Sequence, residues 1–576
     1  MKDITITAHR RDEKKSIQAP EGQSLLKSIR AMGFSLRALC GERGTCGSCR
    51  VKVLEGELPP SGADAAFFSE ADIKAGWRLA CAAYPTGDIQ VEIGAAGEED
   101  FDSVLTFQLA DPDKKPLQVE EIQLAKSKKS IVSQLGGSGE LGLPLLQAAG
   151  KIARGTDQPY YVTRYGGRIV QIEEAPKNLY AIGVDIGTTT IGLALVDLQS
   201  AGVIGRLSMV NRQREYGADV VTRIVKAKEG ELSILSGTVR KQLAEGILRL
   251  CRDNGINPDK VVKVAIAGNT TMLHLLLELN CDLLGRFPFT PVSLERMSIP
   301  YPELFDGKFS CGVDVLPGIS TYVGADITSG LLYLMLHKSD RPGILLDIGT
   351  NGEMALARDG ALLCTSTAAG PALEGVNITW GTGSVPGAIS SVRYGESGFG
   401  VSTIGGKTPV GICGSGVIEG IYQLLENNII SNTGRFQDKF ASTGAVIAQT
   451  ARGEDIVINQ KDVREVQLAK SAIRSGMEVL IRRSGLRYED IGTLYIAGGF
   501  GFNINFHSGV GIGLVPPELE DKIRVTGNSS LGGVVSYLID PERKLEVMDE
   551  IIQVSSEFSL SEDKDFDDLF IENMSF

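Results

Sequence analysis

Four cysteines near the start of the chain have the spacing of an iron–sulfur cluster site. Cys40, Cys46, Cys49 and Cys81 follow one another as C-x5-C-x2-C-x31-C. Four thiolates can hold a [2Fe–2S] cluster when three come from a tight loop and the fourth from a distant segment. Glycines between the first three cysteines let the backbone wrap a cluster and direct N–H groups at its sulfur atoms. The pattern predicts that these four cysteines ligate a [2Fe–2S] cluster.

Other chemistries are open to the same cysteines. Cys46 and Cys49 alone could form a thioredoxin-like pair, but no βαβ pattern follows them. A four-cysteine zinc site usually combines two C-x2-C pairs, and only one is present. The chain has nine cysteines, an odd number, and no export signal at its start. We therefore expect reduced thiols or metal ligands and no disulfides.

A second constellation is a carboxylate–glycine–threonine loop that follows an apolar run. Asp185 ends the run, and Gly187, Thr188 and Thr189 come directly after it. A carboxylate at a strand end can hold Mg²⁺, usually through water. The glycine admits a phosphate close to the backbone, and the threonine N–H and hydroxyl groups can bind its oxygens. One such loop is weak evidence for a nucleotide site.

The same loop recurs about 160 residues later. Asp347 ends another apolar run, and the following turn supplies the corresponding small and polar residues Gly349, Thr350 and Asn351. Two such loops at the ends of buried strands favour a nucleotide clamped between two lobes. Glu353 follows the second loop and could orient the water that attacks the phosphate. The alternative for Glu353 is a solvent-facing carboxylate on a strand.

Two further segments and one lysine could contribute to the same site. Gly498 and Gly499 follow another apolar run, where small residues would let an adenosine lie against the backbone; the alternative is a tight turn. Residues 411–417 open an apolar helix and could form a phosphate turn, a hinge or a packing contact. Lys470 has helical surroundings and could either reach the nucleotide or lie on the surface.

The elements that must position these residues are of two kinds. From about 178 to 576, short apolar runs alternate with amphipathic stretches, which is typical of α/β organisation. We expect buried strands at 180–185, 191–196, 261–267, 344–348 and 493–497, and helices at 239–251 and 466–481. The repeated Asp-Ile-Gly-Thr turn indicates an internal duplication. In residues 1–94, strands near 4–9, 16–19, 50–54 and 89–93 and a helix at 24–32 predict a small α+β unit.

These patterns divide the chain. We expect a cluster-binding domain over 1–94, a glycine-rich and acidic linker over 95–102, a small middle domain over 103–177, and a large nucleotide-binding domain over 178–576. With 576 residues, the chain is too long for a single core.

Composition excludes some classes of function. The formal net charge of −13 argues against nucleic acid as a partner. No run of 18 or more apolar residues is present, so we expect no membrane span. The polar start of the chain lacks the apolar region of a signal peptide.

Both halves resemble known families. Residues 1–94 look like a β-grasp [2Fe–2S] ferredoxin, with a first cysteine gap closer to the adrenodoxin type than to the plant type. The three loops of residues 178–576 resemble, in order, the first phosphate, second phosphate and adenosine loops of the actin/Hsp70/sugar-kinase ATPases. That resemblance implies ATP and Mg²⁺ as ligands, with Asp185, Asp347 and Glu353 as the catalytic carboxylates.

A ferredoxin joined to this ATPase type resembles the reductive activators of corrinoid proteins (RACo-type proteins). The resemblance extends to segments 211–219, 267–272 and 370–375. It implies ATP-dependent transfer of one electron from the [2Fe–2S] cluster to a cob(II)amide-containing corrinoid protein, regenerating cob(I)amide for anaerobic methyl transfer. It further implies an upstream low-potential electron donor, a homodimer and, because cob(I) is sensitive to oxygen, the cytoplasm of an anaerobe. Residues 376–386 become a candidate contact with the corrinoid.

Three alternatives stay open. A small-molecule kinase with an accessory redox-sensing ferredoxin domain would need a substrate pocket that the sequence does not reveal. A plain electron carrier would not need two intact aspartate loops. Activators of radical dehydratases usually carry a [4Fe–4S] cluster between two subunits, and the cysteine spacing of this chain does not fit such a cluster.

Overall fold

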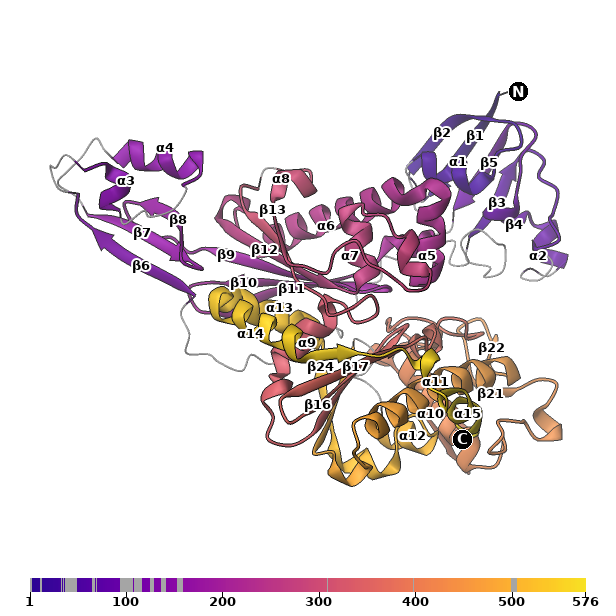
Figure 1. Cartoon of the computed structure of the whole chain (residues 1–576). Helices are drawn as coiled ribbons and strands as arrows, with labels where there is room; N and C mark the ends of the chain where they lie inside the picture. Colours follow the sequence, from indigo (N-terminus) through magenta and orange to yellow (C-terminus); the bar gives the residue numbers. More distant parts are fainter. Residues whose placement is uncertain are drawn as a thin grey trace.

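The computed structural model describes most of the chain, and it arranges that part as several units with separate cores (Figure 1). The described residues are 3–10, 13–32, 34, 36, 49–64, 68, 70–93, 107, 116–124, 129–135, 141–152, 159–307, 309–396, 398–498 and 505–576. Among them, no helix is both long enough and apolar enough to cross a membrane.

The N-terminal unit is a mixed sheet covered by one helix. Its strand order is β2-β1-β5-β3-β4, with β1 antiparallel to β2 and parallel to β5. Side chains alternate along β5, where Ile89, Val91 and Ile93 are buried and Glu92 is exposed, as the period of a half-buried strand requires. The bounds are β1 Asp3–Arg10, β2 Glu13–Pro20, α1 Leu25–Ala31, β3 Arg50–Glu55, α2 Glu70–Lys74, β4 Trp77–Leu79 and β5 Ile89–Ile93. The predicted β-grasp unit is confirmed.

A small antiparallel sheet follows and extends away from the rest of the molecule (Figure 1). It has the order β6-β7-β8 and carries two short helices with their own small core. Its bounds are β6 Leu117–Ile122, α3 Ile131–Gln134, α4 Leu143–Ile152, β7 Tyr160–Tyr165 and β8 Arg168–Glu173. The Tyr165 hydroxyl donates to the carbonyl of Leu538 at 2.7 Å, which ties this sheet to the next unit.

The first large lobe is built on a six-stranded sheet of order β11-β10-β9-β12-β14-β13. Strands β9, β10 and β11 form an antiparallel meander, and β12 and β14 add in parallel on the other side of β9. The bounds are β9 Tyr180–Ile186, β10 Thr190–Asp197, β11 Gly202–Val210, α5 Val220–Lys226, α6 Leu232–Asp253, β12 Val261–Gly268, α7 Thr270–Leu277, β13 Met297–Pro300, α8 Tyr301–Leu304, β14 Gly312–Val315 and α9 Ala325–Leu334.

The second lobe repeats this topology and confirms the duplication. Its sheet order is β24-β23-β15-β16-β17-β25, in which β15, β16 and β17 form the meander and β23 and β24 add in parallel. The bounds are β15 Gly343–Ile348, β16 Gly352–Arg358, β17 Ala361–Thr367, β18 Ala388–Gly395, β19 Gly398–Thr403, β20 Gly411–Ile412, α10 Gly414–Glu426, β21 Ala445–Gln449, β22 Asp455–Ile458, α11 Gln460–Arg483, β23 Thr493–Ala497, α12 Phe506–Gly511, β24 Ile523–Gly527, β25 Ser555–Glu557 and α15 Phe566–Glu572.

The chain returns to the first lobe through α13 (Ser529–Ile539) and α14 (Pro541–Val554). Residues of α13 and α14 belong to the same hydrophobic core as those of β9 and α9. A β-carbon at Gly533 would lie 1.9 Å from the carbonyl oxygen of Ser329, so α13 and α9 are packed backbone to backbone. The helices that connect the two lobes therefore form one bundle.

Candidate active site at the cleft between the lobes

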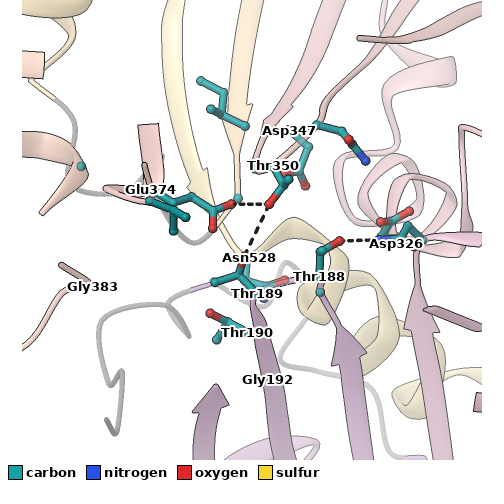
Figure 2. Close-up of a pocket in the computed structure, with 18 of the residues that line it drawn as sticks. Thr188, Thr189, Thr190, Gly192, Asp326, Asp347, Thr350, Glu374, Gly383 and Asn528 are labelled. Atoms are coloured by element: carbon teal, nitrogen blue, oxygen red, sulfur yellow. Dashed lines mark hydrogen bonds between the residues drawn. The ribbon is translucent and has the colours of Figure 1, made fainter. Parts of the chain in front are cut away.

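A cleft of about 360 Å³ opens between the two lobes (Figure 2). Its lining includes the described residues of the three predicted loops: Asp185, Gly187, Thr188, Thr189, Asp347, Gly349, Thr350, Asn351, Glu353 and Gly498. Gly499 lies outside the described residues. The Thr189 and Thr350 hydroxyl oxygens are 3.4 Å apart, so the two loops meet across the cleft. Two segments distant in sequence thus form one site.

Asp185 lies at the end of β9 and is held by the start of α13. Asn528 donates from Nδ2 to one carboxylate oxygen at 2.9 Å, and Ser530 donates from Oγ to the other at 2.8 Å. Asn528 also caps α13, because its Oδ1 accepts from the backbone N–H of Leu531 at 2.7 Å. Burial raises the pKa of Asp185, and these two donors oppose the increase. The carboxylate is therefore fixed in position.

Thr188 of the same loop is held by the start of another helix. Asn269 donates from Nδ2 to the Thr188 hydroxyl at 3.0 Å. It also caps α7 by accepting from the backbone N–H of Met272 at 2.9 Å. Helix N-termini present partial positive charge and favour phosphate oxygens. The N-termini of α7 and α13 thus both face the first phosphate loop.

Two side chains of the second phosphate loop donate hydrogen bonds to glutamates of the second lobe. Asn351 donates to Glu353 Oε1 at 3.1 Å, and Thr350 donates to Glu374 Oε1 at 3.3 Å. Burial, followed by the charges of Asp326, Asp185 and Glu374, raises the pKa of Asp347 to about 8.

Glu353 is 7% exposed and faces the cleft, so the alternative of a solvent-facing strand carboxylate is wrong. Burial raises its pKa well above the ordinary value, and the charges of Asp326 and Asp347 add to this. A cation nearby would oppose this increase and favour the carboxylate form that a general base requires.

Two acidic residues of the cleft were missed from the sequence. Asp326 is the second residue of α9, where no strand–Asp–Gly–Thr pattern marks it, and burial beside Asp185 raises its pKa to about 7. Glu374 is buried in the cleft wall, and burial raises its pKa. Segment 370–375 had been singled out by resemblance, without a role for Glu374.

The carboxylates of the cleft are matched to a hydrated cation. Asp185, Asp326, Asp347, Glu353 and Glu374 face one small space, and most of them raise one another's pKa. Within the described part of the chain, no three Asp, Glu, His or Cys side chains are placed to ligate one metal directly. Mg²⁺ usually keeps several waters and binds through one or two carboxylates and the phosphates of its nucleotide. The residues present fit that mode of binding.

Gly498 is a close-packing position beneath the second loop. Its φ is 95°, and a β-carbon there would lie 2.5 Å from the carbonyl oxygen of Ile348 and 2.7 Å from Asp347 Oδ1. Only glycine fits such a position without movement. The helix predicted after residue 411 is α10, and its first residue, Gly414, also lines the cleft.

Lys470 neither reaches the cleft nor lies on the surface. It is 1% exposed on α11, and its ammonium donates to the carbonyl of Ser575 while facing the Phe576 ring. Burial lowers its pKa to about 8. Both predictions for Lys470 are wrong because the end of the chain folds back over α11.

The structure describes two of the four predicted cluster ligands. Cys49 and Cys81 are both buried, and the backbone N–H of Cys81 donates to Cys49 Sγ at 3.5 Å. Asp64 fixes the segment before Cys81 by accepting from the backbone N–H of Leu79 at 2.7 Å. Cys40 and Cys46 lie outside the described residues. Two adjacent buried thiols, one with a backbone donor, fit a cluster site.

Three family models match separate parts of the chain. The 2Fe-2S iron-sulfur cluster binding domain matches residues 8–86, the RACo middle region matches 180–339, and the C-terminal domain of RACo, the ASKHA domain, matches 341–576. The fold and the site thus define an iron–sulfur protein with an actin-like ATPase domain. The chain belongs to the RACo family.

Named relatives support the assignment. The corrinoid activation enzyme RamQ of Eubacterium limosum is 33% identical over 440 residues, covering 71% of this chain and 73% of that protein. The [Co(II) methylated amine-specific corrinoid protein] reductase of Methanosarcina barkeri is 25% identical over 418 residues, covering 66% and 73%. The solved structure of a reductive activator for corrinoid, iron-sulfur protein superposes with a TM-score of 0.74 at 29% identity, covering 100% of this chain and 98% of that one.

Proposed function

We propose that this chain is an ATP-dependent reductive activator of a corrinoid protein. It passes one electron from its [2Fe–2S] cluster to cob(II)amide on the partner and regenerates cob(I)amide for methyl transfer. The observation that carries this proposal is the union, in one chain, of a ferredoxin domain and a cleft with two facing aspartate loops. Relatives with these parts are named as corrinoid activators and reductases.

The cleft residues divide the work on Mg-ATP. Asp185 and Asp347 face each other from the two strand ends and are suited to hold the waters of a magnesium ion. The hydroxyl and backbone groups of Thr188, Thr189 and Thr350 are suited to bind phosphate oxygens, together with Asn351. Bound Mg²⁺ supplies positive charge that offsets the phosphates and the carboxylates.

Glu353 is suited to orient the water that attacks the terminal phosphate. Burial and the charges of Asp326 and Asp347 raise its pKa, and a cation bound beside Asp347 would oppose that increase and favour the carboxylate. Phosphoryl transfer requires positioning and charge neutralisation more than covalent chemistry. Gly498 and Gly499 border the adenosine in this proposal, and Gly349 borders the phosphates.

ATP is needed because the electron transfer is uphill. Simple [2Fe–2S] ferredoxins have potentials near roughly −400 mV, and a Co(II)/Co(I) couple in a protein is expected to be lower. For one electron, about 59 mV is a factor of ten in equilibrium. Work on the order of 5 kcal/mol would shift the couple by roughly 200 mV. The ATPase can deliver this only by binding one coordination state of the cobalt more tightly than another.

Several finer points belong to the same proposal. Cys40, Cys46, Cys49 and Cys81 hold the cluster, which accepts and gives one electron at a time. A low-potential donor reduces it, and the active form is a homodimer, which light scattering would test. The division at 94, 102 and 177 is retained as the domain organisation.

Anaerobic UV–visible spectroscopy tests the proposal. A cob(II) corrinoid protein is mixed with this protein and a low-potential donor, with and without Mg-ATP. We expect a cob(I) band that rises only with Mg-ATP and is absent in Asp185→Ala and in Cys46→Ala. ATP hydrolysis without cobalt reduction, against several corrinoid proteins, would contradict the proposal and direct attention to a kinase activity.

A further inference from the structure

One segment of the first lobe holds the backbone of the first phosphate loop from outside. We call residues 211–223, between β11 and the interior of α5, the brace. Asn211 donates from Nδ2 to the carbonyl of Gly187 at 2.9 Å and from its backbone N–H to the carbonyl of Thr189 at 2.8 Å. Arg223 donates from Nη2 to the carbonyl of Thr188 at 2.5 Å. The carbonyls of three consecutive loop residues therefore depend on the brace.

The brace is anchored inside the lobe, so it moves as a unit. Asn211, Gln213 and Arg223 are each 0% exposed. Gln213 donates to the carbonyl of Leu235 at 3.0 Å, and Arg223 donates from Nε to the carbonyl of Gly217 at 3.0 Å. Segments anchored by such buried contacts shift between discrete arrangements and do not deform continuously. A displacement of the phosphate loop is therefore passed to the whole brace.

The brace also faces the cleft directly through Arg214. The Arg214 side chain lines the cleft, and its charge opposes the increase in the pKa of Glu374. A phosphate group entering the cleft would attract this guanidinium. The nucleotide can thus act on the brace through both the loop carbonyls and Arg214.

The brace also contacts the ferredoxin domain, through the two residues that follow Arg214. Arg30 of α1 donates from Nη2 to the carbonyl of Glu215, and its guanidinium stacks over the Tyr216 ring at 4.3 Å from the centroid. The same arginine donates to the carbonyl of Leu36 at 3.3 Å, within its own domain. Leu36 lies four residues before Cys40 in the sequence. Figure 1 shows the ferredoxin sheet beside the end of the first lobe that carries α5.

We propose that the brace couples the nucleotide site to the ferredoxin domain, with Arg30 as the residue through which the domain docks. Filling the cleft changes the stability of the docked position, and docking changes nucleotide affinity by the same factor, because coupling between two sites is reciprocal. The inference rests on the proposed nucleotide site and does not depend on the corrinoid acceptor.

The test uses the full-length protein with its cluster oxidised, so that no electron transfer takes place. Calorimetry gives the dissociation constants of Mg-ADP for the wild type, Arg30→Met, Tyr216→Leu and the double variant. Lys27→Met is the matched control, since Lys27 is an exposed residue of the same helix and its loss removes the same charge. Cluster absorbance verifies that each ferredoxin domain is intact.

We expect Arg30→Met to change the dissociation constant about fivefold or more, and Lys27→Met to leave it unchanged. The two single changes should not add in the double variant, because they remove one contact. Hydrogen–deuterium exchange supplies an independent measurement. Mg-ADP should change amide exchange in both residues 212–216 and residues 25–31 of the wild type, but only in 212–216 of Arg30→Met.

The outcomes separate the two proposals. Two results together would overturn the coupling and leave the proposed function intact: Arg30→Met binds Mg-ADP with wild-type affinity, and Mg-ADP does not change amide exchange at residues 25–31 of the wild type. If the coupling is found but no ATP-dependent cobalt reduction is seen, this inference is supported and the proposal that a corrinoid protein accepts the electron is contradicted. A protein that binds no nucleotide would overturn both.

Discussion

The two phosphate loops share the run Asp-Ile-Gly-Thr but are stabilised in different ways. The first loop is held from outside, by the brace at its carbonyls and by Asn528 and Ser530 at Asp185. In the second loop, Asn351 and Thr350 donate hydrogen bonds to Glu353 and Glu374, which belong to the second lobe itself. Within the described part of the chain, no side chain donates a hydrogen bond to the Asp347 carboxylate.

This difference appears in the acid–base chemistry. Two donors oppose the burial of Asp185, whereas burial and three nearby carboxylates raise the pKa of Asp347 to about 8. The duplicated turn provides the same groups twice, and the surroundings decide their charge. We infer that Asp185 is prepared before the ligand arrives and that Asp347 becomes fully charged only with a cation present.

The largest expected effect tests whether both loops are needed. Asp185→Asn and Asp347→Asn should each lower the rate of ATP hydrolysis by about 10²-fold or more, the range found when one preorganised electrostatic group is removed. Steady-state phosphate release measures this. Lys461→Gln, a change at an exposed residue that does not line the cleft, is the control. Near-normal hydrolysis in either aspartate variant would break the proposed pairing.

Without nucleotide, Asp185→Asn and Asp347→Asn should change the melting temperature of the protein in opposite directions. The folded-state pKa of Asp347 is raised, so its contribution is favourable at low pH and is lost as pH rises toward about 8. Asp347→Asn removes that loss and should raise the melting temperature at pH 8, with relief of about 1.4 kcal/mol per pKa unit. The gain should shrink at pH 5.

Asp185→Asn should instead lower the melting temperature. The amide that replaces the Asp185 carboxylate places an NH₂ group against one of the two donors, Asn528 or Ser530. A buried polar group left without a hydrogen-bond partner costs about 1–3 kcal/mol. Thermal denaturation of both variants at pH 8 measures the pair. Shifts of the same sign would contradict the different roles assigned to the two loops.

A smaller effect is expected at the cap of α13. Asn528→Ala removes an N-cap and one donor to Asp185, which should destabilise the protein by about 1 kcal/mol. Because that donor opposes the increase in the pKa of Asp185, Mg-ATP affinity should weaken more at pH 6 than at pH 8. Denaturant unfolding and calorimetry at both pH values check this. Asn505→Ala, which removes the cap of α12 away from the cleft lining, is the matched control.

The smallest expected effect is the release of protons when the metal–nucleotide complex binds. Asp326 and Asp347 have pKa values raised to about 7 and about 8, so at neutral pH each is partly protonated in the free protein. A divalent cation lowers both values, so protons should leave on binding and affinity should rise as pH increases through that range. Calorimetry in buffers of different ionisation enthalpy measures the release. Proton uptake would contradict the assignment of a metal–nucleotide complex.

Local patterns in the sequence were enough to predict much of this architecture. The strands at 180–186 and 343–348 are short apolar runs, and the turns that follow carry the repeated motif, so their pairing across a cleft could be expected. The duplication was visible for the same reason. Helix α6 begins seven residues before the predicted start at 239; Ser236, Gly237 and Thr238, which precede that start, are weak helix formers.

Residues brought to the cleft by tertiary packing could not be predicted in the same way. Asp326 and Asn528 lie at the starts of α9 and α13, which adjoin the cleft only because these helices pack together between the lobes. An asparagine before a helix, such as Asn528, indicates an N-cap, but it does not predict the hydrogen bond to Asp185. Lys470 illustrates the reverse error, since helical spacing does not reveal that the end of the chain covers it.

The bundle of α9, α13 and α14 has a mechanical consequence. The chain passes between the lobes after α9, before α13 and after α14, and Lys338 and Glu550 join two of these passages through an ion pair at 2.9 Å. Crossings gathered at one place act as a pivot and restrict the lobes to rotation about it. The ferredoxin domain and the small β6–β8 sheet are both attached to the first lobe. A single rotation about this pivot would therefore move the ferredoxin domain and the β6–β8 sheet together, as one rigid body, relative to the second lobe.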